Sequence, residues 1–193
     1  MITFSISVPS LTFIKYLFCT FETITSKVIQ LKEILTQYAS YNVWANERIA
    51  NAVLSQPAEL QQKNMVSSFS SLQSTLQHIW YAENIWWQRL LLVENIQPVS
   101  NGQYSMDEIA AGLIDQSKKW FDWVEKSKPH ALEHVFAYRN SKKEQFKQPV
   151  FQVLMHMFNH ATYHRGQIVT MLRQLGVERI PATDFIVFTR SKK

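Results

Sequence analysis

Residues 154–172 read LMHMFNHATYHRGQIVTML, a stretch in which apolar residues and histidines both repeat at the spacing of an α-helix. Residues three or four apart lie on one face of a helix, so the apolar members of this stretch form a core-facing stripe. They are Leu154, Phe158, Ala161, Ile168 and Leu172. The helix is predicted to start near Pro149, a favoured first-turn residue, and to end at Gly176, a favoured C-terminal cap.

Three other proline-free stretches show the same periodicity, at about residues 31–53, 71–92 and 105–124. The second is apolar around most of its circumference, so we expect it to be the most buried helix. The third opens with Ser105 and Glu108 at the spacing of a capping box, which satisfies two free backbone donors at a helix start.

Apolar and aromatic residues over 134–139 and 144–147 flank a polar turn, which predicts a short β-hairpin between the last two helices. The apolar tail over 184–188 is expected to pack back on the helices. The sequence therefore predicts an all-α fold, a four-helix bundle with a short β-hairpin between helices three and four.

The first 29 residues are interpreted as an N-terminal extension ahead of a bundle domain over residues 30–193. Pro9 and Lys15 interrupt its apolar run, so it makes a poor membrane span. No positive residue precedes the run, which also argues against a signal peptide. Two interpretations stay open, a loosely packed extension and a start codon placed too early.

Composition limits the classes of partner. The single cysteine, Cys19, excludes an internal disulfide framework and predicts a reducing, cytoplasmic location. The net charge of +5 is scattered and forms no long basic stripe, so neither a nucleic acid nor a membrane is expected as a partner.

Three histidines, His156, His160 and His164, follow one another at intervals of four residues. Neighbours in this series are ~6 Å apart along a helix and can bind one ion, but the outer two are ~12 Å apart and cannot. On a helical wheel His164 points furthest toward the apolar face and His156 furthest away. The pair His160 and His164 is therefore the predicted site, with His156 beside it or at the surface.

Two histidines leave a metal ion short of ligands, and His78 is the best third one because it lies midway along the most apolar helix. His130 and His134 follow Pro129 in a predicted loop and are weaker choices. The alternative is a set of hydrogen-bonded bundle histidines without metal; the graded burial and the third histidine favour metal.

Three further residues lie close to these histidines in the sequence. Arg165 falls inside the apolar arc, where its long stem either carries the charge to a surface carboxylate or holds a substrate. Gln167 is placed to hydrogen-bond a ligating histidine. Glu83, beyond His78, is interpreted as a surface or network residue and not as a ligand.

The run Asn159–Gln167, together with His78–Glu83, resembles the DinB/YfiT-like family of damage-inducible, metal-dependent proteins. The resemblance covers about residues 31–190 and includes Tyr38–Asn46 and Pro181–Asp184, while the N-terminal thirty residues depart from it. It implies an up-down-down-up bundle, usually a homodimer, with a solvent-open zinc or nickel site.

In that family the metal site is formed by three histidines, and the matching positions here are His78, His160 and His164. Some relatives transfer low-molecular-weight thiols onto electrophiles, or isomerise small acids with a thiol cofactor. Three histidines with an open position are typical of a catalytic metal. No glutamate follows the first histidine as in His-Glu-x-x-His proteases, which favours thiol activation over hydrolysis.

We therefore expect a metal-dependent transferase or hydrolase that acts on a small molecule and activates a low-molecular-weight thiol. His156, Arg165 and Gln167 are the candidate residues around substrate or metal. The alternative function is a non-catalytic metal-binding protein of the stress or damage response.

Overall fold

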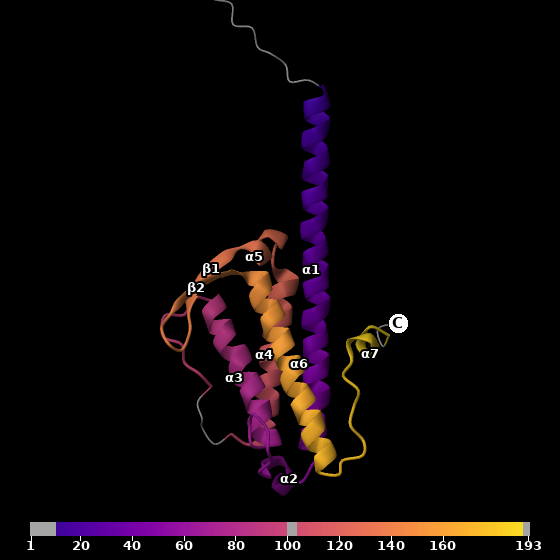
Figure 1. The fold of residues 1–193 in the computed structure, drawn as a ribbon, viewed down its shortest axis with the longest axis vertical. Helices are drawn as coiled ribbons and strands as arrows, with labels where there is room; N and C mark the ends of the chain where they lie inside the picture. Colours follow the sequence, from indigo (N-terminus) through magenta and orange to yellow (C-terminus); the bar gives the residue numbers. More distant parts are fainter. Residues whose placement is uncertain (1–10, 100–103, 191–193) are drawn as a thin grey trace, which may run out of the picture.

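A computed structural model describes residues 11–99 and 104–190, with side chains from residue 30 onward (Figure 1). Its elements, in chain order, are α1 Leu11–Leu54, α2 Ala58–Gln62, α3 Leu72–Leu90, α4 Met106–Lys126, α5 Pro129–Glu133, β1 Val135–Arg139, β2 Gln145–Pro149, α6 Val150–Gln174 and α7 Phe185–Arg190.

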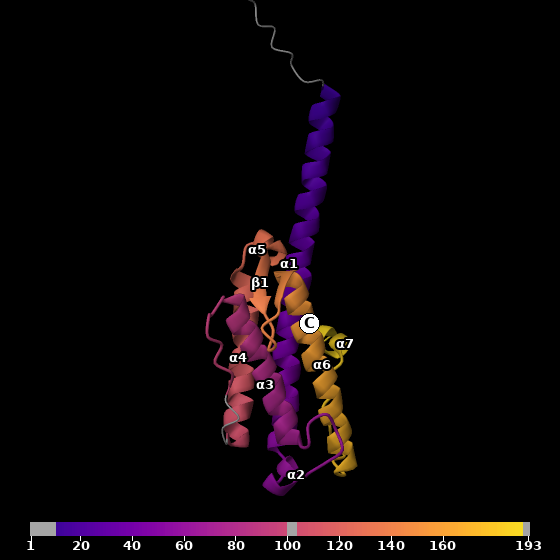
Figure 2. The same ribbon diagram turned by 60° about the vertical axis from the view of Figure 1, so that its left-hand side comes forward.

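The four long helices α1, α3, α4 and α6 form a bundle in which α1 and α3 each pack against α4 and α6. Helices α3 and α4 run opposite to α1, whereas α6 runs in the same direction as α1 (Figures 1 and 2). The parallel neighbours α3 and α4 are joined by the long connection after Leu90. The up-down-down-up bundle that the family resemblance implies is therefore confirmed.

The predicted helix ends of α4 and α6 are also confirmed. At the start of α4, Glu108 N–H donates to Ser105 Oγ at 3.2 Å, and Ser105 N–H donates to Glu108 Oε2 at 2.7 Å. Pro149 directly precedes α6. After α6, Gly176 adopts a φ of 82°, and Val177 N–H donates back to the Leu172 carbonyl at 3.0 Å. Glycine tolerates this left-handed conformation, so the helix ends there.

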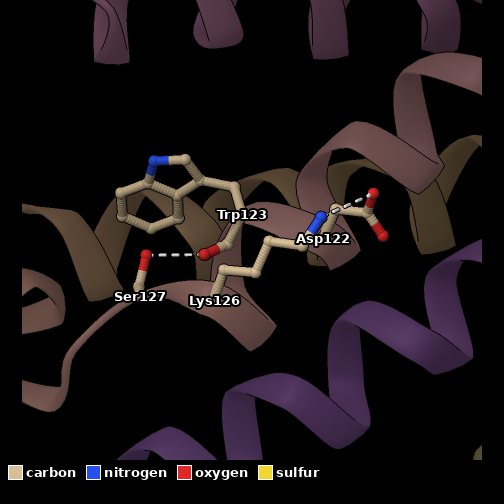
Figure 3. Close-up of polar contacts among 4 residues, drawn as sticks. All are labelled: Asp122, Trp123, Lys126 and Ser127. Carbon is tan, nitrogen blue, oxygen red and sulfur yellow. Dashed lines mark hydrogen bonds and ion pairs between the residues drawn. The ribbon is translucent and has the colours of Figure 1, made fainter.

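The last turn of α4 is closed by two side-chain contacts (Figure 3). Ser127 Oγ donates to the Trp123 carbonyl at 2.6 Å, and Lys126 Nζ lies 3.4 Å from Asp122 Oδ2. The Trp123 carbonyl also accepts from Ser127 N–H at 2.9 Å, so the hydroxyl adds a second donor at the helix end. Lys126 places positive charge at the negative end of the helix dipole.

Helix α1 begins at Leu11, well before the predicted start near residue 31, and extends past the rest of the bundle (Figure 1). No proline or glycine lies between Leu11 and Leu54, so no residue in that span breaks the helix. Residues 1–10 lie outside the described residues. The division at residue 30 and the early start codon stay predictions.

The hairpin and the tail are confirmed. Strands β1 and β2 pair antiparallel, with Phe136 opposite Gln148, and the Phe136 side chain is buried against the bundle. In the tail, Phe188 of α7 is buried against Tyr41 and Trp44 of α1. Within the described residues, no helix is both long enough and apolar enough to cross a bilayer.

Gly112 on α4 packs directly against the Trp80 ring of α3. A Cβ atom placed there would overlap the Trp80 ring, whereas one at Gly166 on α6 would meet no atom within 4 Å. For Gly112→Ala we expect an overpacking cost of about 1–3 kcal/mol, which exceeds the ~1 kcal/mol gained in helix propensity. Urea unfolding should show a less stable Gly112→Ala and a Gly166→Ala as stable as wild type or more so. Equal shifts for the two variants would contradict this packing.

Candidate metal centre

The structure brings together the three histidines predicted as ligands. His78 comes from α3, while His160 and His164 lie one turn apart on α6. The Nε2 atom of His160 is 3.1 Å from Nε2 of His78 and 3.1 Å from Nε2 of His164. One ligand atom from each residue falls within 4.8 Å of the other two. Three nitrogens of the right type thus converge on one point between α3 and α6.

A cation fits this convergence better than hydrogen bonding does. Two contacts meet at His160 Nε2, and a single proton on that atom would have to be shared between them. Three imidazoles bound to one ion at ~2.0–2.1 Å in tetrahedral geometry have nitrogens ~3.3 Å apart, close to the spacing here. The described residues therefore form a site that could hold a divalent metal ion.

The orientation of His164 is set by Gln167, as predicted. Its Nδ1 lies 2.8 Å from Gln167 Oε1, and Gln167 Nε2 donates to Ser68 Oγ at 2.9 Å. An amide oxygen only accepts, so Nδ1 carries the proton and Nε2 presents its lone pair to the site. The Nδ1 atom of His160, in contrast, is buried with no hydrogen-bond partner in the described part of the chain.

Burial keeps these histidines neutral at physiological pH. Desolvation, together with repulsion from the nearby His164, lowers the pKa of His78 to about 4. Burial also lowers the pKa of His160 to about 4, with added repulsion from His164, His78 and His156. For His164, burial lowers the pKa and the hydrogen bond with Gln167 opposes the shift. Neutral imidazole is the form that binds metal ions.

Aromatic rings surround one side of the histidines. The Phe69 ring stacks on the His78 ring with centroids 3.9 Å apart, and Tyr81 stacks on His78 more loosely at 6.4 Å. A cavity of about 300 Å³ opens beside them, lined by Phe69, His78, Tyr81 and Val99 among others. The site therefore has an open, largely apolar approach, which the sequence did not indicate because Phe69 lies in a loop.

His156 is not part of the cluster. It is more exposed than His160 and His164, in the order that the helical wheel predicts. Its ring lies 5.3 Å from Trp86 and 5.8 Å from His160, measured between centroids. His156 thus borders the seam between α3 and α6 one turn away from the converging nitrogens.

Arg165, the candidate for holding a substrate, is buried in the core with 2% exposure. Its Nη1 donates to Asn42 Oδ1 at 2.9 Å and to Asn46 Oδ1 at 2.7 Å, and its Nη2 donates to Thr162 Oγ1 at 2.7 Å. Among the hydrogen bonds in the described residues, none joins Arg165 to the metal-site histidines or to a surface carboxylate. Its partners lie mainly on α1, so the charge is engaged in the core.

Glu83 completes this network from α3. Its Oε1 accepts from Asn42 Nδ2 at 2.9 Å and from Asn46 Nδ2 at 3.0 Å, and its Oε2 accepts from Ser117 Oγ at 2.9 Å. The side chain is 1% exposed. Of the two interpretations made from the sequence, the network one is confirmed. Asn42 and Asn46 were missed, although two polar residues within the apolar stripe of α1 were the available signal.

Comparison with known proteins matches most of the chain. The sequence model of the DinB family matches residues 28–192. Protein DinB of Bacillus subtilis strain 168 is 27% identical over 165 residues, which are 79% of this chain and 94% of that protein. A DinB-like protein from Bacillus cereus ATCC 10987 has a similar fold, with a TM-score of 0.60 and 18% identity over 78% of this chain and 95% of the other. A DinB-like protein from Bacillus subtilis gives a TM-score of 0.57 and 11% identity, over 77% and 98% of the two chains.

Removing the hydrogen bond that orients His164 should weaken metal binding without removing a ligand. For Gln167→Ala we expect ~10–100-fold lower affinity for Zn²⁺, because the imidazole loses the partner that fixes its tautomer. Competition against a chromophoric chelator measures this. The matched control is Gln174→Ala, at the exposed end of the same helix. Equal affinities for the two variants would contradict the role of Gln167.

The buried carboxyl group of Glu83 should make stability depend on pH. Desolvation raises its pKa from 4.5 to about 7, against opposing hydrogen bonds and the charge of Arg165. The folded state then binds a proton more tightly than the unfolded state, so this contribution to the free energy of unfolding falls as pH rises from 4.5 to about 7. Urea unfolding of wild type and Glu83→Gln between pH 4.5 and 8 isolates it, since the histidines are common to both.

We expect the free energy of unfolding of wild type to fall relative to that of Glu83→Gln as pH rises to about 7. Above that pH the difference between the two proteins should stay constant. A difference that moves in favour of wild type as pH rises would mean that the Arg165 charge and the hydrogen bonds outweigh desolvation.

Proposed function

The chain belongs to the DinB family, and on that premise we propose that it is a metal-dependent transferase that joins a low-molecular-weight thiol to a small electrophile. The observation that carries the proposal is the convergence of three neutral imidazoles, His78, His160 and His164, beside an open cavity. We propose zinc or nickel as the ion, because both suit imidazole ligands.

Three protein ligands leave a fourth position for a ligand from solution, as in catalytic sites and not in closed structural ones. A divalent ion bound there would act as a Lewis acid that favours the thiolate form of a thiol at neutral pH. The chain's own residues hold the site in place, since Gln167 orients His164 and Phe69 packs against His78.

The surroundings favour thiol transfer over hydrolysis. A hydrolase would need a general base within hydrogen-bond reach of a water molecule. In the described part of the chain, no carboxylate contributes to the pKa shifts of the three histidines. Glu83, the nearest acidic residue to His78 along α3, is engaged in the core with Asn42 and Ser117.

The proposed transfer balances without a further reactant. The thiol sulfur forms a bond to the electrophilic carbon, a leaving group such as chloride departs with its bonding electron pair, and the thiol proton goes to solvent. The apolar and aromatic wall of Phe69, Tyr81 and Val99 would exclude water around the sulfur and hold the electrophile.

Turnover of a thiol with 1-chloro-2,4-dinitrobenzene tests the function directly. Metal-loaded protein should accelerate dinitrophenyl thioether formation for at least one common bacterial thiol. We expect His164→Ala to lose this activity, because it loses a ligand, and His130→Ala, a histidine outside the cluster, to keep it. Absorbance of the product and elemental analysis of each variant measure rate and metal content together.

Metal-loaded wild type that turns over none of the thiols would overturn the transferase proposal. Stoichiometric metal without turnover would instead support the non-catalytic, metal-binding alternative. A His164→Ala variant as active as wild type would separate any activity from the histidine cluster.

A further inference from the structure

Arg89 lies on the same face of α3 as His78, about three helical turns further along. Its guanidinium carbon is 4.5 Å from the centre of the Trp86 ring and 5.5 Å from the centre of the Tyr138 ring in β1. These rings hold the stem and the planar head between them, so the side chain is ordered even though no backbone group binds it.

The charge of Arg89 is not paired with an acidic residue in the described part of the chain. Within the same residues, its Nε is buried without a hydrogen-bond partner. Burial lowers the pKa of the guanidinium, which the nearby Tyr138 and Tyr81 oppose. The guanidinium is partly exposed, so it can take a carboxylate or phosphate from solution as a charge-assisted hydrogen-bond partner.

Two lines of rings connect Arg89 with the metal centre along the seam between α3 and α6. In one, His160 contacts His156, which contacts Trp86 beneath the guanidinium. In the other, His78 stacks on Tyr81, which lies close enough to Arg89 to raise its pKa. The rings of Tyr81, Trp86 and His156 therefore lie between the guanidinium and the three histidines.

Cavities flank these rings at both ends. One of about 300 Å³ borders His78. The other, of about 520 Å³, has two cations, Arg89 and Arg139, and one carboxylate, Glu94, in its lining. The connection after α3 passes along both, because Ile96 lines the second cavity and Val99 lines the first. A molecule that occupies both cavities has to be longer than either of them.

We propose that Arg89 binds the anionic end of an elongated small molecule whose other end reaches His78, His160 and His164. The inference rests on the proposed function only in assigning a thiol to that other end. The Cα atoms of His78 and Arg89 are ~16 Å apart along α3, and the Arg89 side chain leans back toward the helix N-terminus. A short mercapto acid could not span this distance, so the substrate class is an extended thiol with a carboxylate or phosphate several bonds from the sulfur.

Two pairs of probes differ only in the anion. One pair is 4′-phosphopantetheine and pantetheine, and the other is glutathione and its diethyl ester. Calorimetric titration of metal-loaded and metal-free protein measures each affinity. For wild type we expect the charged member of at least one pair to bind about tenfold tighter or more, which a charge-assisted bidentate contact supplies. The pair that shows the preference identifies phosphate or carboxylate.

For Arg89→Gln this preference should disappear while metal content stays at the wild-type level. Arg48→Gln is the matched control, because Arg48 also stacks on a tryptophan, Trp44 at 4.9 Å, but lies on α1. Should Arg89→Gln fail to fold, Arg89→Lys keeps the stem and the charge without the planar fork and should keep only part of the preference.

Equal affinities within both pairs, or a preference that is unchanged in the Arg89 variants, would overturn the inference. A preference that depends on Arg89 in protein without thiol transferase activity would sustain it and overturn only the proposed function.

Discussion

The bundle depends on one buried pair of opposite charges, Arg165 and Glu83, joined through two asparagines. Each buried charge costs several kcal/mol unless its hydrogen bonds are satisfied. Asn42 and Asn46 meet part of this need at both ends, since each amide accepts from Arg165 at its oxygen and donates to Glu83 at its nitrogen. Arg165 Nε is buried without a hydrogen-bond partner among the described residues. With Ser117 from α4, the network draws on all four helices of the bundle. A different helix packing would leave both charges unsatisfied, so the network favours one arrangement.

The network also fixes how α1, α3 and α6 are aligned along the bundle axis. The candidate metal centre depends on that alignment. Arg165 follows His164 directly on α6, and Glu83 lies a turn and a third beyond His78 on α3. Both charges contact the same two amides of α1. Apolar packing alone tolerates slippage by a helical turn, about 5.4 Å, which would separate His78 from the histidines of α6. The buried charges oppose that slippage and so hold His78 beside His160 and His164.

The parts of this protein that could be predicted from sequence are those encoded by neighbouring residues. The helices, the Ser105 capping box, the Gly176 cap and the hairpin each rest on a pattern of a few positions, and all appear in the structure. The candidate metal centre could be predicted because two of its histidines share one helical face. The buried network could not be predicted, since Asn42, Glu83 and Arg165 lie far apart in the sequence and only the packing brings them together. Arg165 was accordingly left between a surface and a substrate role, and its partners proved to be in the core.

Different faces of helix α3 make different contacts. Glu83 lies about 140° around the helix from His78 and points into the bundle, whereas Arg89 returns to within about 20° of His78 and faces the seam with α6. Any shift of α3 that changed the contacts of Glu83 would also move His78 relative to α6. Stability and site geometry are therefore coupled through α3. The seam residues Trp86 and Arg89 take no part in the core network, so binding along the seam can vary among sequences that keep the same bundle and the same three histidines.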